Sequence, residues 1–94
     1  MAAGGPVEFE LKPGETRLQI PTQLFISTTV TVFNGNPTPG RISMTAGGSP
    51  TEFDDILQRV SGQDVAVTKL QRSFGGVLLA IKNEGSVGLA FSIE

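Results

Sequence analysis

The sequence predicts a mainly β protein: an antiparallel β-sandwich, immunoglobulin-like or jelly-roll-like, with about seven strands and one short α-helix. Three observations predict this class. Several short segments alternate apolar and polar residues with period two, as strands do when one face is buried. Twelve glycines and six prolines place turn signals between those segments. The segments recur at a spacing of roughly 8–12 residues, which is typical of sandwiches and barrels.

A tight turn joins the first two predicted strands. Residues 7–11 and 16–20 both alternate apolar and polar side chains. The sequence KPGE at residues 12–15 suits a type II turn, because proline presets φ at the second position and glycine accepts a positive φ at the third. Pro21 ends the second strand, since it has no N–H to donate to a neighbouring strand.

The third predicted strand, residues 24–33, is the richest in β-branched residues, which favour a pleated surface. One face is expected to hold Ile26, Thr28, Val30 and Val32, and the other Phe25, Ser27, Thr29, Thr31 and Phe33. The middle of the second face is polar, so we expect it to meet solvent or a partner. A loop at residues 34–40 follows, and then a strand at 41–46.

The segment at about residues 50–60 predicts a helix. Ser49 and Glu52 have the spacing of a capping box, with proline between them at the first helical position. Apolar residues then follow at the spacing of one helix face: Phe53, Ile56, Leu57 and Val60. Nearby acidic residues, Glu52, Asp54 and Asp55, are interpreted as charge at the helix N-terminus rather than as a metal site.

The β pattern resumes with predicted strands at residues 64–72, 77–82 and 87–93. Glycine-containing turns at 73–76 and 83–86 separate them, and the second turn predicts a hairpin. The nearly continuous apolar run at 77–81 predicts a central strand covered on both faces. We therefore expect residues 7–94 to form a single domain, preceded by a flexible lead-in at residues 1–6.

Composition argues against several functions. The chain has no cysteine and no histidine, so it lacks the thiolate nucleophile, the usual general base and the commonest transition-metal ligand. We expect no enzyme activity, cofactor or metal. The seven Lys and Arg residues are scattered and the net charge is −2, so neither nucleic acid nor a membrane is an expected partner. Without a signal peptide or membrane-spanning run we expect a soluble protein, of unknown compartment.

These observations favour a structural or protein-interaction module that associates with itself. The contact would be a strand edge or the polar face of the third strand, where small hydroxyl side chains can pack closely against another sheet. The alternative is a glycan- or peptide-binding module that uses the loop from Asn34 to Arg41 and neighbouring turns. The candidate partner-binding residues are Ser27, Thr29, Thr31, Asn34, Asn36 and Arg41.

Overall fold

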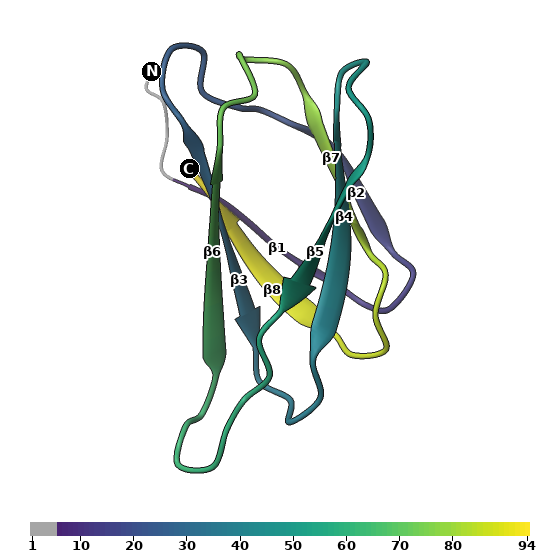
Figure 1. Ribbon diagram of the computed structural model, residues 1–94, viewed down its shortest axis with the longest axis vertical. Coiled ribbons are helices and arrows are strands. Elements are labelled where there is room, and N and C mark those ends of the chain that lie inside the picture. The colour runs from purple at the N-terminus through teal and green to yellow at the C-terminus, as the bar shows by residue number, and fades with distance from the viewer. Residues whose placement is uncertain (1–5) are drawn as a thin grey trace.

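A computed structural model describes residues 6–94 as two sheets packed face to face (Figure 1). Each sheet has four strands, and the described residues contain no helix. The strands in chain order are β1 (Val7–Leu11), β2 (Thr16–Ile20), β3 (Thr28–Asn34), β4 (Gly40–Ala46), β5 (Glu52–Ile56), β6 (Ala66–Arg72), β7 (Leu79–Asn83) and β8 (Leu89–Ile93). Most of the predicted lead-in, residues 1–5, lies outside the described residues.

The strand order is that of a jelly roll. The first sheet has the order β1-β8-β3-β6, the second has β2-β7-β4-β5, and all neighbours are antiparallel. Four strand pairs are nested in the sequence, the first strand with the last and so on to the middle: β1·β8, β2·β7, β3·β6 and β4·β5. This is the pairing of one long hairpin that has folded into two layers. Of the two predicted kinds of sandwich, this topology is the jelly roll.

The predicted helix at residues 50–60 is wrong. Residues 52–56 form β5, which pairs with β4 from Met44↔Glu52 to Gly40↔Ile56. Of the apolar residues assigned to the helix face, only Ile56 is buried. The ladder with β4 supplies backbone hydrogen bonds and buries Ile56 in the core. A single helix of this length gains little stability without a buried face, so tertiary pairing overrides the capping signals.

The predicted hairpin at residues 83–86 is also wrong, because β7 and β8 belong to different sheets. The run at 77–81 is only partly a strand. β7 is central, between β2 and β4, but Val77 and Leu78 precede it and are exposed. By contrast, the turn at 12–15 is confirmed: the Glu15 N–H donates to the Lys12 carbonyl at 3.0 Å, and Gly14 has φ 85°.

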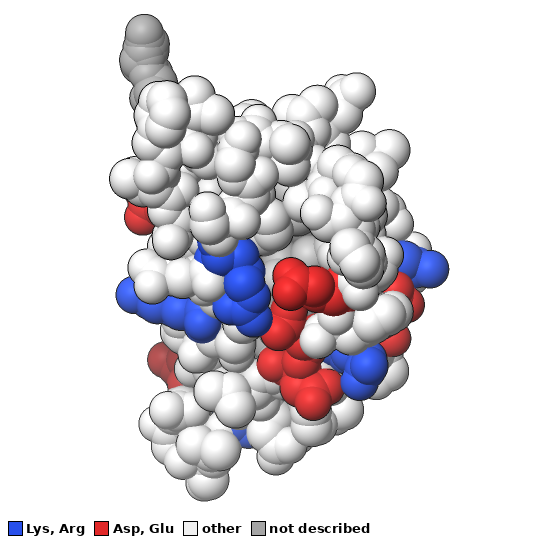
Figure 2. Space-filling model, turned by 45° about the horizontal axis from the view of Figure 1, so that its top comes forward, with Lys and Arg blue, Asp and Glu red and all other residues white. Residues whose placement is uncertain are grey.

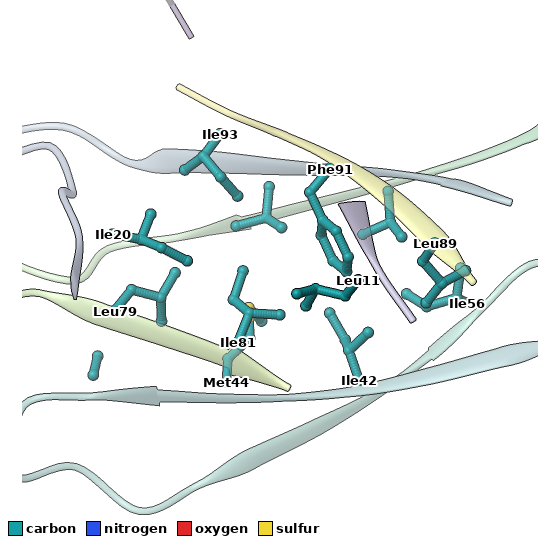
Figure 3. Packing of buried hydrophobic residues seen from close by; sticks show 13 residues of the cluster. Leu11, Ile20, Ile42, Met44, Ile56, Leu79, Ile81, Leu89, Phe91 and Ile93 are labelled. Atoms are coloured by element: carbon teal, nitrogen blue, oxygen red, sulfur yellow. The ribbon is translucent and has the colours of Figure 1, made fainter. Parts of the chain in front are cut away.

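The core lies between the sheets, where side chains from both layers point toward one another (Figure 3). The ring of Phe91 stacks on that of Phe9, with centroids 5.0 Å apart. The inward positions predicted for the third and fourth strands are confirmed from Thr28 onward. The buried apolar cluster comprises Leu11, Ile20, Val30, Val32, Ile42, Met44, Ala46, Ile56, Leu79, Ile81, Leu89, Phe91 and Ile93.

Two of the connections between the sheets are arches of equal length. Residues 35–39 join β3 to β4, and residues 84–88 join β7 to β8. Each arch follows a fully buried asparagine, Asn34 or Asn83, that ends its strand. Buried amide groups need partners, and both side chains donate to two backbone carbonyls.

No helix in residues 6–94 is long and apolar enough to cross a membrane.

Candidate functional site

The outer surface of the first sheet carries the hydroxyl side chains of β3 that the sequence predicts to be part of a contact surface. We call it the hydroxyl face. Because side chains alternate along a strand, residues at odd positions of β3 and β6 and at even positions of β1 and β8 point outward. Thr29 and Thr31 lie there, half-buried among neighbouring strands. The hydrogen bond from the Gln71 amide to the Thr29 hydroxyl, at 3.2 Å, spans two adjacent strands on this face.

The strand register places one charged row across the hydroxyl face. Glu8 of β1 is level with Ser92 of β8, which is level with Thr31 of β3, which is level with Lys69 of β6. A carboxylate therefore lies at one edge, an ammonium at the other, and two hydroxyls between them. Both Glu8 and Lys69 are exposed. Within residues 6–94, neither forms an ion pair.

The next row along the strands is largely apolar. It runs from Glu10 through Ala90 and Phe33 to Val67. Ala90 is the smallest side chain of the four, and a shallow hollow of about 340 Å³ lies beside it, bordered by Glu8, Glu10 and Phe33. Phe33 stands next to this hollow. The hydroxyl face thus carries a half-buried phenyl ring that lines a shallow depression.

A second depression lies at the other end of the hydroxyl face. Its volume is about 620 Å³ and it is wide open to solvent. Its lining is polar and consists of Thr29, Thr31, Lys69, Gln71, Arg72 and Glu94. The hydroxyl face therefore has small side chains on its two central strands and shallow relief, as close packing against another surface requires.

The six predicted site residues do not form one site. Thr29 and Thr31 share the hydroxyl face, and Ser27 is exposed just before β3. Asn34 is fully buried, and Asn36 is half-buried, with its carbonyl accepting the Arg59 N–H at 2.8 Å. Arg41 lies on the second sheet, where its guanidinium sits 5.1 Å from the centre of the Phe53 ring and 3.4 Å from Asp55.

A cleft lies between β5 and β6, which are edge strands of the two different sheets. The sequence did not predict this cleft, because its pattern assigned the residues of β5 to a helix. The Arg72 guanidinium lies 3.2 Å from one oxygen of Asp54, while the other oxygen is buried with no hydrogen-bond partner in the described structure. An adjoining hollow of about 420 Å³ is lined by residues that include Glu52, Arg72 and Ser73. Acidic and basic side chains meet across the middle of the face in Figure 2. Residues 6–94 contain no group of three or more metal-ligating side chains.

One end of the sandwich is uncharged, a feature that the sequence reasoning also missed. The loops at residues 21–27, 47–51 and 73–78 meet there and contain no Asp, Glu, Lys or Arg. Figure 2 shows this end as a white region above the charged middle. Phe25 is 92% exposed. Its neighbours Leu24 and Ile26 are also exposed, as are Val77 and Leu78 on the adjacent loop. Thr22 donates to the Val77 carbonyl at 2.6 Å and ties two of the loops together.

A family of unknown function, DUF8244, matches residues 9–94. No curated protein and no solved structure matches the chain.

Proposed function

We propose that this chain, which belongs to the DUF8244 family, is a non-enzymatic structural or protein-interaction module that associates with itself through the hydroxyl face. The observation that carries the proposal is the pair of rows across the first sheet. One row has two hydroxyl side chains between opposite charges at the two edges, and the other is largely apolar and lies beside a shallow hollow. Electrostatic complementarity of this kind sets the register and partner of an interface.

The hydroxyl face is a better contact surface than the strand edges of the second sheet. Exposed edges promote pairing when they are long, flat and apolar. Here β2 has an irregular register between Arg17 and Ile20, and Gln19 has φ 59°. β5 is short and acidic. Both features protect the edges of the second sheet from pairing, so the first sheet, which carries the hydroxyl face, is the better candidate for a contact between two copies.

The absence of catalytic residue types supports a non-enzymatic role. Without histidine or cysteine, acid–base or nucleophilic chemistry would depend on less common groups. The alternative ligand-binding role of the loop from Asn34 to Arg41 receives less support. The Asn34 amide already donates to the carbonyls of Thr38 and Leu57, and the Arg41 side chain lies on the second sheet over the Phe53 ring. These residues therefore offer a ligand no shared pocket.

Sedimentation from about 10 µM to about 1 mM, the range suited to weak association, tests the proposal. The wild-type mass should rise toward that of a dimer. Thr31→Arg places a long charged side chain at the centre of the hydroxyl face and should keep the protein monomeric. The matched control is Thr45→Arg, at a half-buried position of the second sheet, which should behave as wild type. A monomeric wild type across the whole range would falsify the proposal.

A further inference from the structure

We infer that the two copies meet about a two-fold axis parallel to the strands of the first sheet, so that Glu8 of each copy pairs with the partner's Lys69. This arrangement rests on the proposed self-association and specifies its geometry. The occupant of the hydroxyl face is thus a second copy of the same chain. The argument for it is charge and shape complementarity of the face with itself.

The two charges of the row cannot satisfy each other within one copy. Glu8 and Lys69 lie on the outer strands β1 and β6, with β8 and β3 between them. Three interstrand spacings of about 4.8 Å separate their backbones by about 14 Å. Exposed charges at that distance are largely screened at physiological salt. A second copy laid on the face brings each charge within reach of an opposite one.

The symmetry axis follows from the order of charges. Rotation by 180° about an axis parallel to the strands, between β8 and β3, keeps each row at its level and reverses its direction. Glu8 then faces the partner's Lys69, and Ser92 faces the partner's Thr31. An axis perpendicular to the strands lays β1 on the partner's β1 instead. That arrangement sets acidic side chains against acidic ones, which disfavours it.

The apolar row fits the same axis. Phe33 and Ala90 are direct neighbours in the register between β3 and β8. Reversal of that row places each Phe33 ring over the partner's Ala90, beside which the hollow of about 340 Å³ lies. A phenyl ring is among the largest apolar contributors to an interface. Both copies make this contact, as an isologous interface requires. The apolar row is therefore compatible with the orientation that the charged row selects.

Charge reversal with rescue tests the axis. Glu8→Lys and Lys69→Glu should each weaken dimerisation about tenfold in low salt, because each change creates two like-charge contacts per dimer. The combination of both restores opposite charges and should return the dissociation constant to within about threefold of wild type. Raising the salt from about 50 mM to about 500 mM should weaken the wild-type dimer, as expected for exposed pairs.

The matched control is Glu10→Lys, alone and combined with Lys69→Glu. It changes the net charge by the same amount, but the inferred axis sets Glu10 opposite Val67 of the partner subunit. This combination should not rescue the dimer. Circular dichroism and thermal melting of each variant establish that it folds. Equal rescue by both combinations, or by neither, overturns the axis while Thr31→Arg still reports on the proposed function. A monomeric wild type overturns both.

Discussion

The arches at residues 35–39 and 84–88 have the same pattern of asparagine hydrogen bonds but different sequences. In each, the asparagine side-chain oxygen accepts an N–H two residues later, and its amide donates to the carbonyl four residues later. What differs is the remaining contact. Asn34 donates to the carbonyl of Leu57 in the β5–β6 loop, whereas Asn83 donates to that of Leu11 at the end of β1. One asparagine therefore secures a loop and the other secures a strand.

The second arch also makes more contacts with neighbouring strands than the first arch does. The backbone of Asn83 accepts the Gly14 N–H and donates to the Glu15 carbonyl, both at 2.9 Å, so the second arch also holds the β1–β2 turn. The first arch contains two prolines, which restrict the chain locally. Where the chain leaves one sheet for the other, buried backbone carbonyls have no partner in a neighbouring strand. The side-chain amide of an asparagine can donate to two such carbonyls. The tertiary contacts of each asparagine then determine how much stability is lost when that asparagine is replaced.

Replacing the asparagines should have the largest effect on stability. Asn83→Ala leaves two carbonyls and one N–H without their side-chain partner at a fully buried site, and should cost about 3 kcal/mol or more. Asn34→Ala should cost about 2 kcal/mol, because the Leu57 carbonyl lies in a loop that can reach water. Urea unfolding of both variants measures the difference. A larger loss for Asn34→Ala would contradict the distinction between strand and loop.

Adding a methyl group where the second arch meets the start of β4 should have an intermediate effect. A Cβ on Gly85 would lie 3.0 Å from the backbone nitrogen of Arg41. A Cβ on Gly40 would lie 3.2 Å from side-chain atoms of Ile56 and Leu89. Side chains shift more easily than backbone, so Gly85→Ala should cost about 2 kcal/mol and Gly40→Ala about 1 kcal/mol.

Gly48→Ala serves as the control for these two variants, because nothing lies within 4 Å of its Cβ position. Its unfolding midpoint should stay at or slightly above that of wild type. The reverse order for Gly85→Ala and Gly40→Ala would show that the second arch moves away from β4 more easily than the geometry indicates.

The smallest effect should come from the prolines of the first arch. Pro37 is exposed, and its contribution is restriction of the unfolded chain. Pro37→Ala should therefore cost about 0.5 kcal/mol in urea unfolding, with no change in the slope of the transition. A loss comparable to that of Asn34→Ala would mean that the proline, rather than the amide, holds the first arch.

Local patterns predicted the strands well where a strand lies beside a clear turn. The bounds of β1 and β2 were predicted correctly, because alternation is strict and a proline–glycine turn separates them. The inward residues of β4 were predicted for the same reason. β5 was missed because residues 49–60, which include it, carry a capping box and apolar residues at the spacing of one helix face. Those signals are local, and the pairing of β5 with β4 that overrides them is not.

The candidate site was predicted only in part, for a similar reason. Alternation assigned Thr29 and Thr31 to one face, and the structure places them on the outer surface. The charges at either edge of that surface come from β1 and β6, which are distant in sequence. Asn34 was assigned to a loop that could bind a partner, and the structure buries it. In both arches the asparagine precedes the next strand by the same number of residues. This repeated spacing was the sequence signal that could have indicated a structural role for Asn34.

The sequence by itself determined the class of the fold, the positions of most strands and the sides of β3 and β4 that face the core. These follow from side-chain alternation and turn chemistry, which act over a few residues. Only the tertiary structure decided which strands are neighbours, which sheet each strand joins and which charges share a surface. The reason is physical: a strand can bond to any complementary edge, and the choice among edges is made by the burial of the whole core.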